Sequence, residues 1–462
     1  MKKLNRYFGN KAFYAMVLSV AVPIMIQNGI SNFVGLLDNI MVGKIGTEPM
    51  SGASIINQLI FVYNLCIFGA VSGAGIFTAQ YYGQNDDEGI RNTFRFKFWI
   101  GTVLTAITIA LFCLLKEPLI TLYLKGEGTA EEIALTMKYA KEYLAVMLWG
   151  LPAFMFSQVY ASTLRECGKT ILPMVSGIVS VVINLTLNYV LIYGHFGAPR
   201  LGVVGAAVAT VISRYVELAL IVIVTHASAS RYSFVKGLYR TLLVPWSLVK
   251  RILIKGTPLL VNETLWAAGM TRLTQCYSLL GYNVIAANNI STTISNVFNI
   301  VFIAMGDAVA IIVGQTLGTG DMERAKDNAR KLTVFSVLCS VGIGAIMFAT
   351  APLFPGFYKT SDSIKELATG LIRVSAVFMP QYAFLHATYF TLRSGGKTFI
   401  TFLFDSVSIW VISVTLATIL TGYTSLNVLT IYVLIQIAEW IKCIVGFILV
   451  KKGIWLQNIV AR

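Results

Sequence analysis

Twelve stretches of mostly apolar residues follow one another along the chain, separated by short polar segments. A helix needs about 20 such residues to cross the hydrocarbon core of a bilayer, so each stretch is long enough for one crossing. The stretches cover residues 13–40, 52–82, 96–115, 139–163, 171–193, 202–226, 256–280, 285–316, 332–350, 367–391, 398–421 and 427–450. The pattern predicts an all-α integral membrane protein with twelve transmembrane helices.

The second half of the chain repeats the first. The segment AQYYGQNDDEGIRN at 79–92 aligns with GQTLGTGDMERAKDN at 314–328, at an offset of 235 residues. Further on, TLRECGKT at 163–170 aligns with TLRSGGKT at 391–398, at an offset of 228. Six spans return the chain to the side of the membrane on which it began, so both halves have the same orientation. We therefore predict two six-helix lobes related by a pseudo-two-fold axis along the membrane normal.

The expected lobes occupy residues 1–227 and 256–462, and a basic cytoplasmic connector at 228–255 joins them as a hinge. Two lobes with short aqueous loops are typical of transporters that work by alternating access around a site between the lobes.

Composition excludes a water-soluble protein. Of the 462 residues, 56% are hydrophobic and 12% charged, whereas a soluble domain has about 25% charged residues. The net charge of +15 would suggest nucleic acid in a soluble protein, but here the basic residues flank apolar segments, where they orient the chain. We expect a multi-pass protein of the inner (plasma) membrane with both termini in the cytoplasm, acting as a monomer without a nucleic-acid partner.

A carboxylate interrupts the first apolar stretch, in the segment SNFVGLLDNIMVG. An ionised Asp near the centre of a membrane helix costs about 2.5 to 3.5 kcal/mol on insertion scales, so Asp38 needs a reason to be there. Gln27, Asn28 and Asn32 precede it, and helical periodicity places Asn28, Asn32 and, nearly, Asp38 along one side. Asp38 is either a functional residue or a helix-end residue at the outer interface.

Two asparagines lie four residues apart in the fifth span, Asn184 and Asn188. On one helix face their amide oxygens can accept a hydrogen bond from a protonated carboxyl group or coordinate a hard cation. The alternative is hydrogen bonding between helices, which is common for Asn in membrane spans. Asp38, Asn184 and Asn188 together form a candidate site for Na⁺ or H⁺.

The seventh span holds Asn262 and Glu263 just after a proline, at positions that correspond to Gln27 and Asn28 at the offset of 235. Arg272 follows nine residues after Glu263, on a different side of the helix and too far along it to be its partner. Glu263 is therefore a functional candidate.

Two charged pairs at i, i+3 spacing in the spans are predicted to be structural. They are Arg214 with Glu217 in the sixth span and Glu439 with Lys442 in the twelfth, and Lys442 lies 228 residues after Arg214.

No enzyme signature is present in the sequence. It has no HExxH, GxSxG or GxxxxGK[ST] motif, its six cysteines form no CxxC, and its three histidines (His195, His226 and His386) are isolated. Without a nucleotide-binding loop, transport must draw on an ion gradient. We expect no cofactor beyond the coupling ion, Na⁺ or H⁺.

The chain resembles the multidrug and toxic compound extrusion (MATE) family of bacterial efflux transporters over its whole length. The matching segments are LLDNIMVG after the first span's centre, AQYYGQND after the second span, NYVLIYGHFGAPRLGVVGAAVAT from the fifth into the sixth, NETLW in the seventh and TLRSGGKT after the tenth.

The resemblance implies a V-shaped pair of six-helix lobes that exports amphipathic, often cationic drugs in exchange for Na⁺ or H⁺. By position, Asp38 matches the first-lobe carboxylate of the coupling site, Asn184 its neighbour, and Glu263 the second-lobe glutamate of the NorM-like branch. Asn188 stands where DinF-like members often have Asp, and Tyr382 stands about where NorM-like proteins have an aspartate. The chain thus mixes NorM-like and DinF-like features.

On this interpretation Asp38 and Glu263 line opposite lobes of a cavity that attracts organic cations and releases them when a coupling cation neutralises a carboxylate. Asn262, Gln27, Asn28, Tyr382 and Trp266 are the further candidate substrate residues. An alternative is a flippase for a lipid-linked saccharide or precursor, but its anionic cargo would favour a cationic cavity. A membrane-embedded enzyme or channel subunit is disfavoured by the missing catalytic residues and by the repeat.

Overall fold

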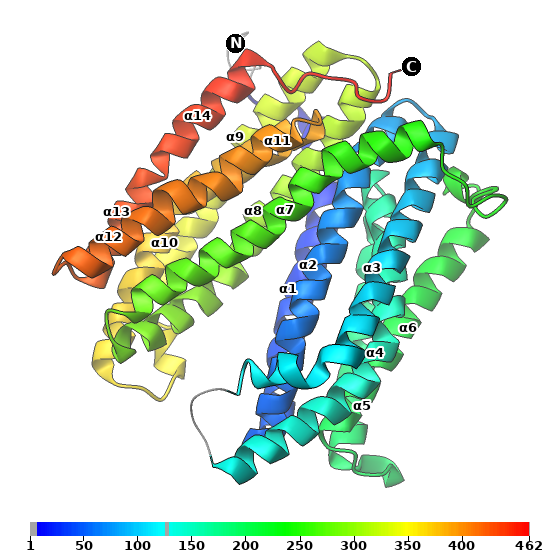
Figure 1. Ribbon diagram of the computed structural model, residues 1–462. Helices are drawn as coiled ribbons and strands as arrows, with labels where there is room; N and C mark the ends of the chain where they lie inside the picture. The colour runs from blue at the N-terminus through cyan, green and yellow to red at the C-terminus, as the bar shows by residue number, and fades with distance from the viewer. Residues whose placement is uncertain (1–6, 125–128, 462) are drawn as a thin grey trace. The chain divides into compact units, whose positions relative to one another are not determined.

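The computed structural model describes residues 7–124 and 129–461, and in these ranges every long element is a helix and no strand occurs (Figure 1). Ten spans in these ranges are single helices. They are α1 (Lys11–Gly43), α2 (Thr47–Gly83), α3 (Asp87–Thr121), α4 (Ala130–Glu166), α5 (Ile171–Tyr193), α6 (Val203–Ala227), α7 (Trp246–Ser278), α8 (Tyr282–Gly318), α9 (Met322–Thr350) and α10 (Asp362–Ser394). Of these, α3 is kinked at Leu115.

Two further helical segments are interrupted. The eleventh runs through α11 (Thr398–Phe402), the π-helical turns η5 (Leu403–Val407) and η6 (Ile409–Val414), and α12 (Thr415–Tyr423). The twelfth consists of α13 (Val428–Ala438) and α14 (Trp440–Lys452), and short 3-10 turns lie at η2 (His195–Gly197), η3 (Ser233–Val235) and η4 (Pro355–Phe357). The predicted all-α architecture of twelve helices is confirmed.

Ten of the twelve segments in the described residues are long and apolar enough to cross a membrane by length and composition alone. The two that do not meet this criterion are α7 and α10, although each has 33 residues. Both helices contain polar side chains in their central part, among them Asn262 and Glu263 in α7 and Gln381 in α10. Asn262 and Glu263 belong to the site described below, whereas Gln381 donates to the main-chain oxygen of Gln436 at 3.0 Å.

The chain packs as two compact units. One comprises Ile26–Thr78 and Asp86–Lys250, where α6 packs on α4 and α5, and α3 packs on α4. The other comprises the chain up to Met25, Ala79–Asn85 and the chain from Arg251 onward, where α10 packs on α8, α9 and α14. Each unit has its own buried apolar core. The predicted lobe limits at residues 227 and 256 stay a prediction.

Several helices begin earlier than the apolar pattern predicts. The Asp86 side chain accepts a hydrogen bond from Gly89 N at 2.9 Å and starts α3, and Asp321 caps α9 through Arg324 N in the same way at 2.9 Å. Arg91, in the polar segment that precedes the predicted third span, therefore lies on α3 and not in a loop. Apolar runs mark the part of a helix that lies in lipid, whereas side chains that satisfy the first free N–H groups decide where the helix starts.

Two glycines explain the sequence repeat at the ends of α2 and α8. A Cβ atom on Gly83 would lie 1.9 Å from the carbonyl oxygen of Gln315, and one on Gly318 would lie 2.0 Å from that of Gln80. Since Gly318 and Gln315 correspond to Gly83 and Gln80 at the offset of 235, each helix contacts the other through the same two positions. Only glycine permits this approach.

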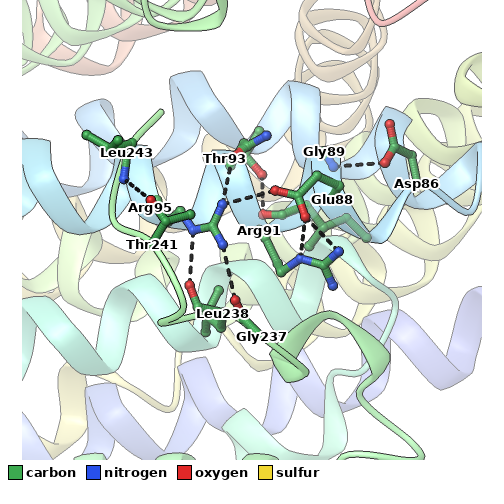
Figure 2. A network of polar contacts seen from close by, with 12 residues as sticks. Asp86, Glu88, Gly89, Arg91, Thr93, Arg95, Gly237, Leu238, Thr241 and Leu243 are labelled. Carbon is green, nitrogen blue, oxygen red and sulfur yellow. Dashed lines mark hydrogen bonds and ion pairs between the residues drawn. The ribbon is translucent and has the colours of Figure 1, made fainter. Parts of the chain in front are cut away.

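The connector between α6 and α7 lies against the start of α3 (Figure 2). Arg95, which is 3% exposed, donates to the carbonyl oxygens of Leu238 at 3.0 Å and Gly237 at 3.2 Å. Glu88 forms an ion pair with Arg95 at 3.0 Å and holds its guanidinium in place. Arg95, a basic residue predicted to orient the chain in the membrane, thus also fixes the connector to the unit that contains α3.

Candidate functional site

Asp38 lies near the end of α1 and faces α5. Asn188 donates from Nδ2 to Asp38 Oδ1 at 2.6 Å, and Asn188 is 1% exposed. A hydrogen bond to an ionised carboxylate is stronger than one between neutral groups, and it is stronger still away from water. The structure therefore brings together two residues that the sequence separates by 150 positions.

Asn184 is the second amide at this carboxylate. Its side chain fits with the nitrogen toward Asp38, 3.0 Å from Oδ1 and 3.2 Å from Oδ2, and with the oxygen 3.2 Å from the hydroxyl of Thr210 on α6. The predicted spacing of four residues thus places both asparagines of α5 on the same carboxylate. The three predicted ion-site residues Asp38, Asn184 and Asn188 form one cluster.

The cluster leaves one acceptor unused. Asn188 Oδ1 is buried and has no hydrogen-bond partner among the described residues. A buried oxygen without a donor is uncommon in a folded protein and points to a missing partner. Carboxylate and amide oxygens are the ligands that a hard cation prefers, and a protonated carboxyl group can also use them.

Arg214 on α6 is a basic group within the sixth span of this unit. It forms an ion pair with Glu217 at 3.2 Å, as predicted, and its guanidinium carbon lies 5.1 Å from the ring centre of Phe154. Among the described ion pairs Arg214 is joined to Glu217 and not to Asp38. Amides therefore hold Asp38, and no basic side chain is paired with it.

In the other unit, Asn262 is a buried amide that contacts a carboxylate. It is 2% exposed, donates to Asp405 Oδ2 at 3.1 Å and accepts from Ser406 Oγ at 2.7 Å. Tyr389 OH lies 3.4 Å from the same amide nitrogen. The sequence analysis did not identify Asp405, although the signal that singled out Asp38, a carboxylate inside an apolar span, was present there too.

Lys442 is the partner of Asp405. Its Nζ lies 3.7 Å from Asp405 Oδ1, whereas Glu439 accepts from Ser413 Oγ at 2.8 Å. The predicted pair of Glu439 with Lys442 is therefore wrong. An i, i+3 pair needs one regular helix through both residues, but α13 ends at Ala438 and α14 begins at Trp440.

Glu263 is next to Asn262 and is partly buried. Among the described residues it forms no ion pair. Arg272 donates to Gln275 Oε1 at 3.2 Å, which agrees with the prediction that Arg272 is not the partner of Glu263.

None of the described hydrogen bonds joins the other predicted substrate residues to these carboxylates. Gln27 lies over Gly177, Asn28 is partly exposed, and Trp266 is 38% exposed. Tyr382 packs in the apolar core of its unit, with its ring centre 6.1 Å from that of Phe302. Their roles in binding stay predictions.

Comparison with known proteins identifies the family. The MatE family model matches residues 23–190 and 258–419, one segment in each half of the chain. Because the matched residues are more than half of the sequence, the chain belongs to the MatE (multidrug and toxic compound extrusion) family. The predicted resemblance is confirmed, and the family consists of transporters rather than enzymes.

Individual relatives agree over most of the length. The chain is 27% identical over 418 residues to the probable multidrug resistance protein NorM of Thermotoga maritima, covering 89% of this chain and 87% of that protein. It is 26% identical over 382 residues to the multidrug resistance protein MdtK of Proteus mirabilis, covering 77% and 81%. The fold matches the crystal structure of MATE in complex with MaD3S with a TM-score of 0.84, 20% identity and 98% coverage of both chains.

Proposed function

We propose that this protein is a secondary active multidrug efflux transporter that exchanges amphipathic, mainly cationic drugs for Na⁺ or H⁺ by alternating access. Membership of the family and the names of the relatives support drug export. The observation that carries the coupling part of the proposal is the Asp38 carboxylate held by Asn188 and Asn184. Because its amide partners are neutral, the negative charge of Asp38 is not compensated by them and can attract a cation.

The mechanism follows from competition for that charge. An ionised Asp38 in a low-dielectric environment attracts either an organic cation or a coupling cation, and a proton removes the attraction altogether. The unused oxygen of Asn188 supplies a further ligand for a small ion, which a bulky drug cannot reach in the same way. Ion entry therefore displaces the drug, and the drug leaves on the other side of the membrane.

The energy source limits the stoichiometry. Moving one charge through about 100 mV is worth roughly 2.3 kcal/mol, but exchanging one monovalent ion for one monovalent drug moves no net charge. Export of a monovalent cation at 1:1 then relies on the concentration gradient of the coupling ion.

Glu263 in the other half is a second carboxylate that adds attraction for cationic drugs.

We place the protein in the inner (plasma) membrane as a monomer with both termini in the cytoplasm. The basic residues beside the spans support this orientation, because positive side chains favour the cytoplasmic side.

Drug accumulation in a bacterium that lacks its own efflux pumps tests the proposal. Cells that express the protein should accumulate less ethidium than cells that express Asp38→Asn at the same membrane level. Equal accumulation in the two strains, with both proteins shown in the membrane, would contradict the proposal.

A further inference from the structure

A buried ammonium group lies in the second half of the chain with few partners. Lys442 is 6% exposed, its Nζ is 3.7 Å from Asp405 Oδ1 and 5.7 Å from the ring centre of Phe404. No hydrogen bond of this ammonium to another described residue is found. A buried charge is strongly unfavourable unless an opposite charge compensates it, so Asp405 is what keeps Lys442 in this position.

The carboxylate of Asp405 is fixed by neutral groups on its other side. Asn262 donates to Oδ2 at 3.1 Å, and Ser406 orients Asn262 by donating to its side-chain oxygen at 2.7 Å and to its main-chain oxygen at 2.8 Å. This arrangement is of the same kind as Asp38 with its two asparagines. Without Lys442 it would be a carboxylate held by an amide N–H on one oxygen, with its other oxygen, Oδ1, left to attract a cation.

The backbone of both helices is adapted at this point. Asp405 and Ser406 lie in the π-helical turn η5, and α13 and α14 are separated at Glu439, three residues before Lys442. Single π-helical turns are rare and are found frequently at functional sites. The interruptions let Asp405 and Lys442 approach each other from neighbouring segments of one unit.

The first half of the chain can be compared with this arrangement, because the internal repeat gives Lys442 and Asp405 counterparts there. Arg214 corresponds to Lys442, and Gly177 corresponds to Asp405, both at the offset of 228. In the first half the glycine lies against Gln27, and Arg214 is paired with Glu217 on its own helix. The basic residue of the first half thus has its own partner, and the carboxylate of that half, Asp38, has no basic partner among the described ion pairs.

We propose that Lys442 is a tethered cation that takes the place of a free monovalent cation at the carboxylate of Asp405, which Asn262 and Ser406 hold in position. The ammonium carries the same charge as Na⁺, so it neutralises Asp405 and excludes a free cation. The second half then binds no coupling ion at this carboxylate, and Asp38 alone provides the ion response. This last step rests on the proposed function, in which Asp38 is the ion site of the first half.

Thermal unfolding of the purified full-length protein, with NaCl against choline chloride at equal ionic strength, tests the inference. The unchanged protein should be stabilised by Na⁺, and Asp38→Asn should remove that stabilisation. Adding Lys442→Gln to Asp38→Asn should restore a saturable rise of the unfolding midpoint with Na⁺, because a ligand that binds only the folded state stabilises it. A further Asp405→Asn change should abolish that rise.

Two controls use matched residues. Lys442→Arg in the Asp38→Asn background keeps the tethered charge and should show no response to Na⁺. Arg214→Gln in the same background removes the equivalent charge of the first half and should also show none.

Two results would overturn the inference. One is a folded Asp38→Asn/Lys442→Gln protein that does not respond to Na⁺, and the other is an Asp38→Asn protein whose response to Na⁺ depends on Asp405. For any variant that unfolds in detergent, binding of radioactive Na⁺ is measured instead on native membranes that contain it. Neither measurement uses drug export, so failure of the proposed export leaves this test intact.

Discussion

Asn188 of α5 donates a hydrogen bond of 2.6 Å to the carboxylate of Asp38 in α1. The bond joins two spans of the first half, and Asn184 adds a second amide one helical turn away. The position explains why an apolar segment contains Asp38, since the charge has polar partners inside the protein. Asp38 is therefore the first residue to substitute in a functional test.

Asp38→Asn should abolish export of cationic dye, because the substitution keeps the size and much of the hydrogen bonding of the side chain but removes its negative charge. Ethidium efflux from preloaded cells measures the effect, and protein levels in the membrane provide the control. Normal efflux that still depends on Na⁺ or acid would show that the coupling role of Asp38 is wrong.

Asn184→Leu should weaken the response to the coupling ion more than the affinity for drug, because the amide can contact an ion but has no charge with which to attract an organic cation. Dye release from membrane vesicles on addition of Na⁺ or acid reports the ion response, and dye binding at equilibrium reports affinity. If both fall by the same factor, Asn184 serves mainly to hold α5 to α6 through Thr210.

Glu263→Gln should reduce export of cationic drugs more than export of neutral ones. The glutamate forms no ion pair among the described residues, so an ionised Glu263 would attract a cationic substrate. The ratio of efflux rates for a cationic and a neutral dye measures this effect. Thr264→Ala, one residue further on the exposed side of α7, is a suitable comparison because it changes no charge. An unchanged ratio would remove Glu263 from the substrate residues.

Asp405→Asn should destabilise the protein because it leaves the ammonium of Lys442 buried without an opposite charge. Breaking a buried ion pair on one side costs about 3 to 5 kcal/mol, whereas replacing both partners by neutral groups is much less costly. The unfolding midpoint should therefore fall in Asp405→Asn and recover in part in Asp405→Asn/Lys442→Gln. A double variant less stable than the single one would show that the two charges do not depend on each other.

Arg95→Ala should loosen the connector, since the carbonyl oxygens of Gly237 and Leu238 lose their donors. Each buried polar group left without a partner costs about 1 to 3 kcal/mol. Limited proteolysis should cut the connector faster in this variant. Arg91→Ala, which removes a more exposed arginine that donates to the Lys236 carbonyl at 3.0 Å, should have a smaller effect.

The sequence by itself determined the class of the fold and the part of the candidate site that surrounds Asp38. The apolar periodicity shows how many helices there are, and the two offsets show that they form related halves. Asp38, Asn184 and Asn188 could be grouped because the spacing of four places both amides on one face, and a carboxylate in lipid needs such partners. The matching segments were sufficient to identify the family.

Only the tertiary structure decided which helices face each other and which charges meet. Lys442 was assigned to Glu439 from spacing, but the interruption between α13 and α14 and the π-helical turn at Asp405 pair it with a residue of the preceding span. Lys97 stands at the start of the apolar stretch 96–115, where the sequence gives it no partner, yet it is fully buried on α3 and paired with Glu166 of α4. Helical spacing fixes which residues share a face, whereas the partner of that face depends on packing between segments that are distant in sequence.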